Sequence, residues 1–200
     1  MNQLNPSIKE YFSESFSGLN ISAQKLDALV FEECEFTDCD FSEAEFSKCK
    51  FVECKFMNCN LSVINVGYSQ FRTVEFDSCK VIGVNWTKAD WPRVSFFNLL
   101  RFQRCILNDS SFFGLSLEEI IIQECKAHDV DFRSCNLREA NLSYTDFSNS
   151  LFNKTNLASA DFTESLNYDI DIYSNDIKNA KFSRYEAVRL LNCLDIELVD

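Results

Sequence analysis

The stretch CEFTDCDFSEAEFSKCKFVECKFMNCNL, residues 34–61, has a phenylalanine or leucine at every fifth position. In an α-helix, five residues turn the side chain about 140° away from its starting face, so no single buried stripe forms. In a β-strand, side chains alternate with period two, so an odd step sends successive phenylalanines to opposite faces. A period of five therefore predicts short extended pieces separated by corners, with the chain coiling around its apolar positions.

The same period continues over most of the chain, and we call the apolar position of each unit its centre. The first run of centres consists of Phe31, Phe36, Phe41, Phe46, Phe51, Phe56, Leu61, Val66, Phe71, Phe76, Val81, Trp86, Trp91 and Phe96. After a shift of one residue near Phe97, the second run consists of Phe102, Leu107, Phe112, Leu117, Ile122, Ala127, Phe132, Leu137, Leu142, Phe147, Phe152, Leu157 and Phe162.

The period also reaches both ends of the chain. It extends backwards through Phe16, Ile21 and Leu26, breaks at Asn167, and resumes at Ile172, Ile177 and Phe182. We therefore expect a lead-in over residues 1–15, one coiled domain over 16–182, and a separate C-terminal element over 183–200.

Nine of the ten cysteines lie two residues before a centre, and only Cys193 does not. The nine are Cys34, Cys39, Cys49, Cys54, Cys59, Cys79, Cys105, Cys125 and Cys135. Because alanine and valine take the same place in other units, we expect cysteine to act as a small, buried, reduced hydrophobe. The chain has no CxxC pair and one histidine, His128, so we expect no metal site and no cofactor.

The N-terminal residues MNQLNPSIKEYF contain no apolar leader, and no stretch is long and apolar enough to span a membrane. A chain without a leader or span, and rich in cysteines that the pattern predicts to be unpaired, is typical of a reducing compartment. We therefore expect a cytoplasmic protein.

The units ANLSY, TDFSN, TNLAS and ADFTE between residues 140 and 164 resemble the pentapeptide-repeat family, whose units read approximately A(D/N)LXX. The resemblance implies an all-β fold, a right-handed quadrilateral β-helix with four units, or twenty residues, in each coil. Because each coil then has twenty residues, centres that are twenty positions apart should stack, which predicts two inner columns. The first contains Phe31, Phe51, Phe71 and Trp91, and the second contains Phe36, Phe56, Phe76 and Phe96.

The last eighteen residues have a different pattern. Ser183 and Glu186 match a capping box, which predicts a short capping helix near residues 184–193, and LDIELVD after it alternates like a strand. Because so short a cap leaves apolar residues uncovered, we expect a two-fold dimer through the C-terminal ends. The expected interface comprises Tyr185, Val188, Leu191, Leu194, Ile196 and Leu198.

The chain carries a net charge of −12, and its acidic residues gather in two stretches. The candidate partner-binding residues are Glu32, Glu33, Glu35, Asp38, Asp40, Glu43 and Glu45 in the first stretch and Asp169, Asp171 and Asp176 in the second. This sign disfavours direct binding to nucleic acid and favours a basic partner. A dimer about 80 Å long would have about half the charge density of a DNA duplex, so DNA mimicry is compatible with the composition.

The pentapeptide-repeat family includes quinolone-resistance (Qnr-type) proteins and self-immunity proteins against gyrase poisons. The resemblance implies binding to DNA gyrase or topoisomerase IV, and so a protective or modulating role against topoisomerase poisons such as quinolones or peptide antibiotics. Many Qnr-type proteins have two projecting loops, whereas we expect a single one-residue shift here. The alternative is a passive interaction scaffold with an unknown partner.

An enzyme would need a catalytic constellation, and the sequence does not provide one. No serine lies in a GxSxG motif, and the chain has only four glycines, too few for a phosphate-binding loop. We therefore expect a protein without catalytic activity.

Overall fold

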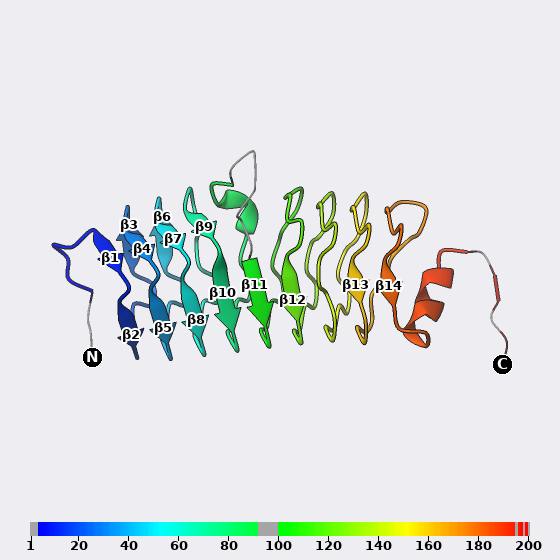
Figure 1. The fold of residues 1–200 in the computed structure, drawn as a ribbon, viewed down its shortest axis with the longest axis horizontal. Coiled ribbons are helices and arrows are strands. Elements are labelled where there is room, and N and C mark those ends of the chain that lie inside the picture. The colour runs from blue at the N-terminus through cyan, green and yellow to red at the C-terminus, as the bar shows by residue number, and fades with distance from the viewer. Residues whose placement is uncertain (1–3, 92–99, 195, 198, 200) are drawn as a thin grey trace.

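The chain folds into a parallel β-solenoid of about eight turns, with its N- and C-termini at opposite ends of an elongated rod (Figure 1). The computed structural model describes residues 4–91, 100–194, 196–197 and 199. Among these residues, no helix is long and apolar enough to cross a membrane. The β-solenoid that the family resemblance implies is confirmed.

The regular elements are short. The strands are β1 (Glu10–Phe12), β2 (Ser15–Ser17), β3 (Lys25–Asp27), β4 (Val30–Glu32), β5 (Glu35–Thr37), β6 (Glu45–Ser47), β7 (Lys50–Val52), β8 (Lys55–Met57), β9 (Gln70–Arg72), β10 (Val74–Asp77), β11 (Leu100–Gln103), β12 (Ile121–Gln123), β13 (Asp161–Phe162) and β14 (Lys181–Phe182). The 3₁₀-helices are η1 (Trp86–Lys88) and η2 (Glu186–Leu191).

Each five-residue unit combines one buried centre with one corner. In β5 the centre Phe36 is buried, and the corner residue Asp38, two positions later, has φ of +54°. The corner N–H donates to the next coil, as Asp38 N does to Met57 O at 3.0 Å. The left-handed corner absorbs the odd residue of the period, so the next centre again points inward.

The Asp or Asn before many centres shapes the following turn. Asp40 Oδ1 accepts the Ser42 N–H at 2.9 Å and the Ser42 hydroxyl at 2.7 Å, and Asn60 does the same for Ser62 at 3.2 and 2.7 Å. Such side-chain-to-backbone bonds favour turns over continuous strands. This explains why the repeat prefers Asp or Asn at this position.

Successive coils stack in register and parallel, with twenty residues between partners over the first four coils. The sheets have the orders β1-β4-β7-β9, β12-β11-β10-β8-β5-β2, β13-β14 and β3-β6. The rings of Phe31 and Phe51 stack at 5.2 Å between centroids, and Phe51 and Phe71 repeat this distance. The coil begins at β1, which pairs with β4, so residues from Glu10 onwards already belong to it.

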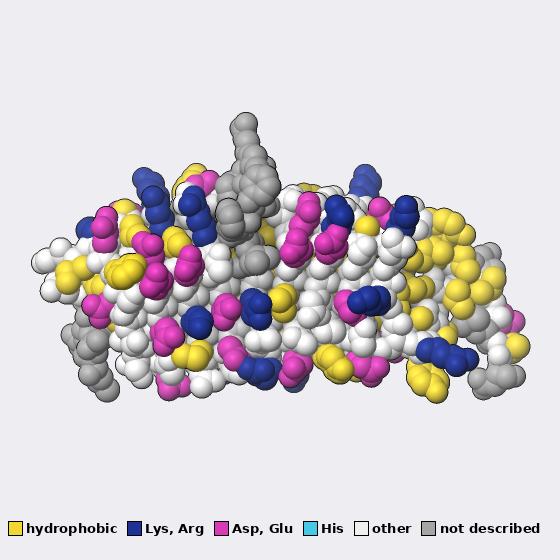
Figure 2. All heavy atoms as spheres, viewed as in Figure 1, with side chains coloured by type: hydrophobic (Ala, Val, Ile, Leu, Met, Phe, Trp, Pro, Cys, Tyr) yellow, Lys and Arg dark blue, Asp and Glu magenta, His cyan; other side chains and the backbone are white. Residues whose placement is uncertain are grey.

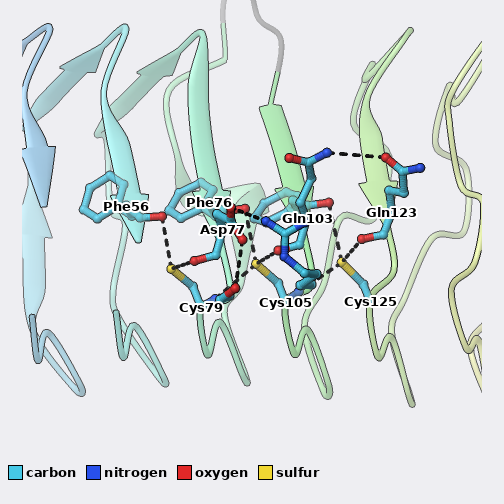
Figure 3. A network of polar contacts seen from close by, with 11 residues as sticks. Phe56, Phe76, Asp77, Cys79, Gln103, Cys105, Gln123 and Cys125 are labelled. Carbon is cyan, nitrogen blue, oxygen red and sulfur yellow. Dashed lines mark hydrogen bonds and ion pairs between the residues drawn. The ribbon is translucent and has the colours of Figure 1, made fainter. Parts of the chain in front are cut away.

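The cysteines form ladders inside the coil, and the expectation that all nine are buried and reduced is confirmed. Figure 3 shows the column that contains Cys79, Cys105 and Cys125. The Cys79 thiol donates to Phe56 O at 3.3 Å and accepts the Cys59 N–H at 3.4 Å. Thr145 continues the column with the same two bonds, to Ile122 O at 2.9 Å and from Cys125 N at 3.2 Å. The column is therefore a chain of polar links as well as an apolar wall.

Replacing Cys79 with alanine is expected to lower the free energy of unfolding by about 1–2 kcal/mol, because the substitution removes a donor and an acceptor of buried main-chain groups. Cys79→Ser is the matched control. It should cost less than half as much, since hydroxyl groups make the same bonds elsewhere in this column. Urea unfolding followed by circular dichroism measures both variants. Equal losses would show that packing of the sulfur, and not its bonds, stabilises the column.

The interruption near Phe97 is larger than the one-residue shift that the period predicts. Phe76 in β10 pairs with Phe102 in β11, so this rung takes 26 residues, six more than a regular coil. Asp90 is still in register with the preceding coil, since its N–H donates to Ser69 O at 2.8 Å, and Trp91 is half-buried against the core. Its indole N–H donates to Trp86 O at 2.8 Å beside η1, and Phe96 lies outside the described residues. The six additional residues therefore follow η1, which lies at the upper edge of the rod in Figure 1.

The second irregularity, after Asn167, also differs from the expectation. Phe152 bridges to Ile170, only eighteen residues on, and regular spacing returns with Asn156 and Asp176. Tyr168 and Ile170 are buried in the core, whereas the predicted centre Ile172 is only half-buried. The Tyr168 ring, which is larger than the Ile172 side chain, contacts the rings of Phe162 and Phe182 in the core.

The C-terminal helix is present, but as the 3₁₀-helix η2 and without the predicted capping box. The N-cap is Tyr185, whose side chain makes no capping bond. Ser183 Oγ accepts the Glu164 N–H at 2.7 Å, and Glu186 Oε1 accepts the Asn167 N–H at 2.7 Å. Both side chains thus bond to the preceding coil. Of the predicted strand LDIELVD, the described residues lie in no strand.

Candidate partner-binding surface

The seven acidic residues between Glu32 and Glu45 surround the second coil instead of lying on one wall. Glu32, Glu35 and Glu45 belong to β4, β5 and β6, which lie in three different sheets. Glu33, Asp38 and Glu43 are exposed on three successive corners, and Asp40 is half-buried on the third side. The seven carboxylates therefore form a belt around the rod.

Several of these carboxylates already have partners within the chain. Glu45 pairs with Lys25 at 2.7 Å, and Glu33 accepts the Ser13 hydroxyl at 2.9 Å. Hydrogen bonds from the Ser42 hydroxyl and N–H lower the pKa of Asp40. Asp40 thus maintains a turn, whereas Glu32, Glu35, Asp38 and Glu43 have no side-chain partner in the described part of the chain and remain available to a partner.

The second acidic stretch lies near the other end of the rod. Asp169 and Asp171 line a shallow cleft of about 230 Å³ together with Arg133. Asp176 is exposed on another side, where its carboxylate accepts the Lys178 N–H at 3.1 Å. The structure therefore brings Asp169 and Asp171 together, but does not bring this stretch near the belt.

One corner carries acidic residues along the axis of the rod. These residues are Glu33, Glu53, Glu119 and Glu139, all exposed and all with φ between +52° and +60°; we call them the axial glutamate row. Glu33, Glu53 and Glu119 each come two residues before a strand of the six-stranded sheet, β5, β8 and β12 respectively, and Glu139 follows Glu119 by one twenty-residue coil. The row therefore runs lengthwise, with Thr73 at the same corner between Glu53 and Glu119, and Glu139 pairs with Arg138 at 2.6 Å.

The sequence analysis missed the axial glutamate row because it looked for acidic residues that are neighbours in sequence. Glu53, Glu119 and Glu139 do not lie in an acidic run, but Glu53 follows Glu33 by one coil, as Glu139 follows Glu119. Adding the coil length to each exposed carboxylate would have found both pairs. Figure 2 shows that Asp and Glu side chains are interspersed with Lys and Arg side chains along the visible face.

A polar network surrounds Asp146 on the third side of the coil. Its Oδ1 atom accepts from Ser148 Oγ at 2.7 Å and Asn167 Nδ2 at 2.9 Å, and Oδ2 lies 2.9 Å from His128 Nε2. Burial raises the pKa of Asp146, but the bonds from Asn167, Ser148 and His128 outweigh it and lower the pKa to about 2.

This shift predicts acid sensitivity. Because the folded pKa of about 2 is below the unfolded value of about 3.9, the stabilisation by Asp146 is complete above about pH 4 and is lost as the pH falls toward 2. Asp146→Asn should therefore unfold at a lower temperature at pH 7 and depend less on pH between 4 and 2. Asp129→Asn, at a neighbouring exposed corner, is the control. If the unfolding temperature of Asp146→Asn depended on pH as strongly as that of the parent protein, the acid sensitivity could not be assigned to Asp146.

In the described part of the chain, no group of three His, Cys, Asp or Glu side chains could hold a metal ion. Burial raises the pKa of Cys54 to about 12, and the hydrogen bond with Cys105, together with burial, does the same for Cys79. Their thiols are thus poor nucleophiles at neutral pH.

The C-terminal end presents apolar side chains to solvent. Tyr185 is 93% exposed and Val188 is 48% exposed, while Leu191 is half-buried on η2. Leu194 is half-buried and Ile196 is exposed beyond η2, and Leu198 lies outside the described residues. Hydrophobic side chains gather visibly at this end of the rod in Figure 2.

The repeat, the four-sided coil and its stacked centres define a class of protein. The family profile described as a pentapeptide repeat region matches residues 29–100 and 97–162, more than half of the chain. The protein belongs to the pentapeptide-repeat family. No curated protein sequence matches it significantly.

Solved structures of this fold resemble the chain over nearly its whole length. One trypsin-treated variant of QnrB1, a plasmid-mediated fluoroquinolone resistance protein, superposes with a TM-score of 0.73 at 20% identity, covering 96% of this chain and 100% of that chain. Another gives 0.64 at 22% identity, with coverages of 96% and 92%. HetL from the cyanobacterium Nostoc, involved in regulating heterocyst differentiation, gives 0.55 at 11% identity, with 87% of each chain covered. At such identities these likenesses establish the fold alone.

Proposed function

We propose that the protein is a non-enzymatic binding protein that occupies the DNA-binding surface of a type II topoisomerase, DNA gyrase or topoisomerase IV. The observation that carries the proposal is the axial glutamate row on a rigid rod. Carboxylates at fixed corners offer a basic groove a lengthwise series of negative charges, as a duplex does. QnrB1 is a fluoroquinolone resistance protein of the same fold, which supports the choice of partner.

On this proposal the protein protects or modulates the enzyme against topoisomerase poisons and acts in the cytoplasm. The ten unpaired cysteines support a reducing compartment. We further propose a homodimer that forms through the exposed surface of η2, centred on Tyr185 and Val188. Light scattering at micromolar concentration tests this: a monomer would leave η2 as a cap only.

The proposal predicts that reversing the row weakens topoisomerase binding. In the triple variant Glu53→Lys, Glu119→Lys and Glu139→Lys, affinity for purified gyrase should fall at least tenfold, because attraction to a basic groove becomes repulsion. The matched control reverses Asp109, Glu124 and Asp129, which are exposed on other corners outside the acidic belt and change the net charge equally. Surface plasmon resonance with and without competing duplex DNA measures both variants.

The salt dependence provides a second readout. Affinity for the parent protein should decrease steeply between about 50 and 200 mM salt, as screening shortens the range of surface charges to about 8 Å. Equal losses in the two triple variants would show that net charge, and not the row, governs binding. Absence of binding at every salt concentration would refute the topoisomerase proposal and favour the scaffold alternative.

A further inference from the structure

Among the described residues, no strand pairs with the outer edge of the first coil. β1, β2 and β3 are the terminal strands of their sheets. One coil later, Asp40 N donates to Leu19 O at 2.7 Å and Glu45 N donates to Gln24 O at 2.9 Å. The equivalent N–H groups of Asn20 and Lys25 therefore point to where a preceding coil would lie, and within the described residues they have no main-chain partner.

A cavity of about 780 Å³ occupies this open end. Leu4 and Ile8 of the lead-in line one wall, and Leu19, Leu26 and Leu29 of the first coil line the floor. The floor is not fully covered: Leu26 and Leu29 are 9% and 8% exposed, whereas Phe46 and Cys49, one coil further, are 0% exposed. The lead-in extends away from β1 at this end of the rod (Figure 1).

The chain contains one further segment with the pattern of a coil unit. Residues 194–198 read LDIEL, and residues 19–23 of the first coil read LNISA. Both have an apolar residue two before the centre, Asp or Asn one before it, and isoleucine at the centre. In the first coil, Asn20 Oδ1 accepts the Ser22 N–H at 3.1 Å, and an aspartate at this position can serve the same turn.

The described residues of this segment do not pair with the coil of their own chain. They lie in no strand, and Ile196 is 56% exposed. The segment emerges at the end of the rod opposite to the open coil, so the two cannot meet within one chain (Figure 1). A second copy must bring them together.

The donor segment is acidic: residues 194–200 contain three acidic residues and no basic one. Lys9, Lys25 and Asp27 line the cavity, and Lys25 already pairs with Glu45 at 2.7 Å. Lys9 therefore offers the unpaired positive charge there, and its Nζ donates to Asp27 O at 3.2 Å. We infer that residues 194–198 of a second copy add to the open first coil as an extra β-rung, with Ile196 over the apolar floor.

This contact is head-to-tail, because the donor segment and the acceptor coil are different surfaces of the same chain. It does not depend on the topoisomerase proposal. It differs from a two-fold dimer through η2, in which both chains contribute the same surface. Two single variants, each blocking one side, distinguish the arrangements.

The experiment mixes full-length Ile8→Asp, which blocks the acceptor, with full-length Ile196→Asp, which blocks the donor. In sedimentation velocity, each variant alone should lose the head-to-tail assembly. Its self-association should be at least tenfold weaker than that of the parent chain. An equimolar mixture should regain the head-to-tail contact between one chain of each kind, because one intact acceptor and one intact donor remain. Phe12→Asp and Val199→Asp, which change exposed residues outside the cavity and the LDIEL unit, are the controls.

A labelled peptide of residues 192–200 provides an independent test. It should bind the Ile196→Asp chain, whose acceptor is intact, and bind a chain carrying both Ile8→Asp and Ile196→Asp at least tenfold more weakly. Circular dichroism confirms that each variant is folded. The inference is overturned if the peptide does not bind, or if Ile8→Asp alone still pairs while mixing restores nothing, which is the signature of a contact through the C-terminal ends only.

Discussion

Replacing Phe56 with alanine is expected to lower the free energy of unfolding by about 3–5 kcal/mol, the cost of removing a phenyl ring from a core that cannot close around the space. Phe56 is fully buried, and its ring stacks between Phe36 at 4.7 Å and Phe76 at 5.1 Å. The rungs above and below are held by main-chain bonds, so neighbouring rings cannot move in to fill the cavity. Chemical unfolding followed by circular dichroism measures the loss.

Phe12→Ala is the matched control for this substitution. Phe12 lies in β1, but its side chain points outward and is 63% exposed, so its removal should change stability by less than about 0.5 kcal/mol. If Phe56→Ala lost no more than Phe12→Ala, the coil interior would have to be far more compliant than its stacked rings indicate.

Deleting residues 184–200 is expected to lower the free energy of unfolding by about 3–5 kcal/mol and to cause aggregation. The deletion removes the Glu186 carboxylate that accepts from Asn167 N, and the contact of Leu190 with the core. A lost bond to a charged group costs about 1.5–3 kcal/mol, and exposing a buried apolar side chain costs a similar amount. The last rung, β14, would also become an uncovered sheet edge.

Thermal unfolding and light scattering of the truncated chain measure these effects. Deleting only residues 194–200 is the control, because it leaves η2 and its bonds to Asn167 intact and should preserve the unfolding temperature. An unchanged unfolding temperature after the longer deletion would show that η2 does not stabilise the coil.

The period of five predicted the inward centres because every unit places one apolar side chain in the core. The structure departs from this pattern only where the number of residues in a coil changes. A phase change of one residue and an insertion of six are identical when positions are counted in fives, so the sequence pattern could not distinguish them. The pairing of Phe76 with Phe102, 26 residues apart, shows that the insertion has six residues. Similarly, Tyr168 took a core position because the chain shortens by two residues there, a change that composition does not reveal.

The C-terminal cap and the acidic surface show a second limit. Ser183 and Glu186 have the right spacing for a capping box, but the free N–H groups of Glu164 and Asn167 in the last coil compete for their oxygens and bind them instead. The acidic belt was predicted from neighbours in sequence, whereas neighbours along the rod are twenty residues apart. The axial glutamate row could be predicted only after the coil length was used.

The in-register pairing of coils has a consequence for how such a protein can evolve. Each rung of twenty residues presents the same inner columns and the same main-chain bonds to the rung on either side, as Phe31, Phe51 and Phe71 do. Duplication of a sixty-nucleotide segment would therefore lengthen the rod by one strand spacing, about 4.8 Å, without a new core or new ends. Gene duplication can thus change the length of the rod in steps of one strand spacing, while the outward-facing residues diverge.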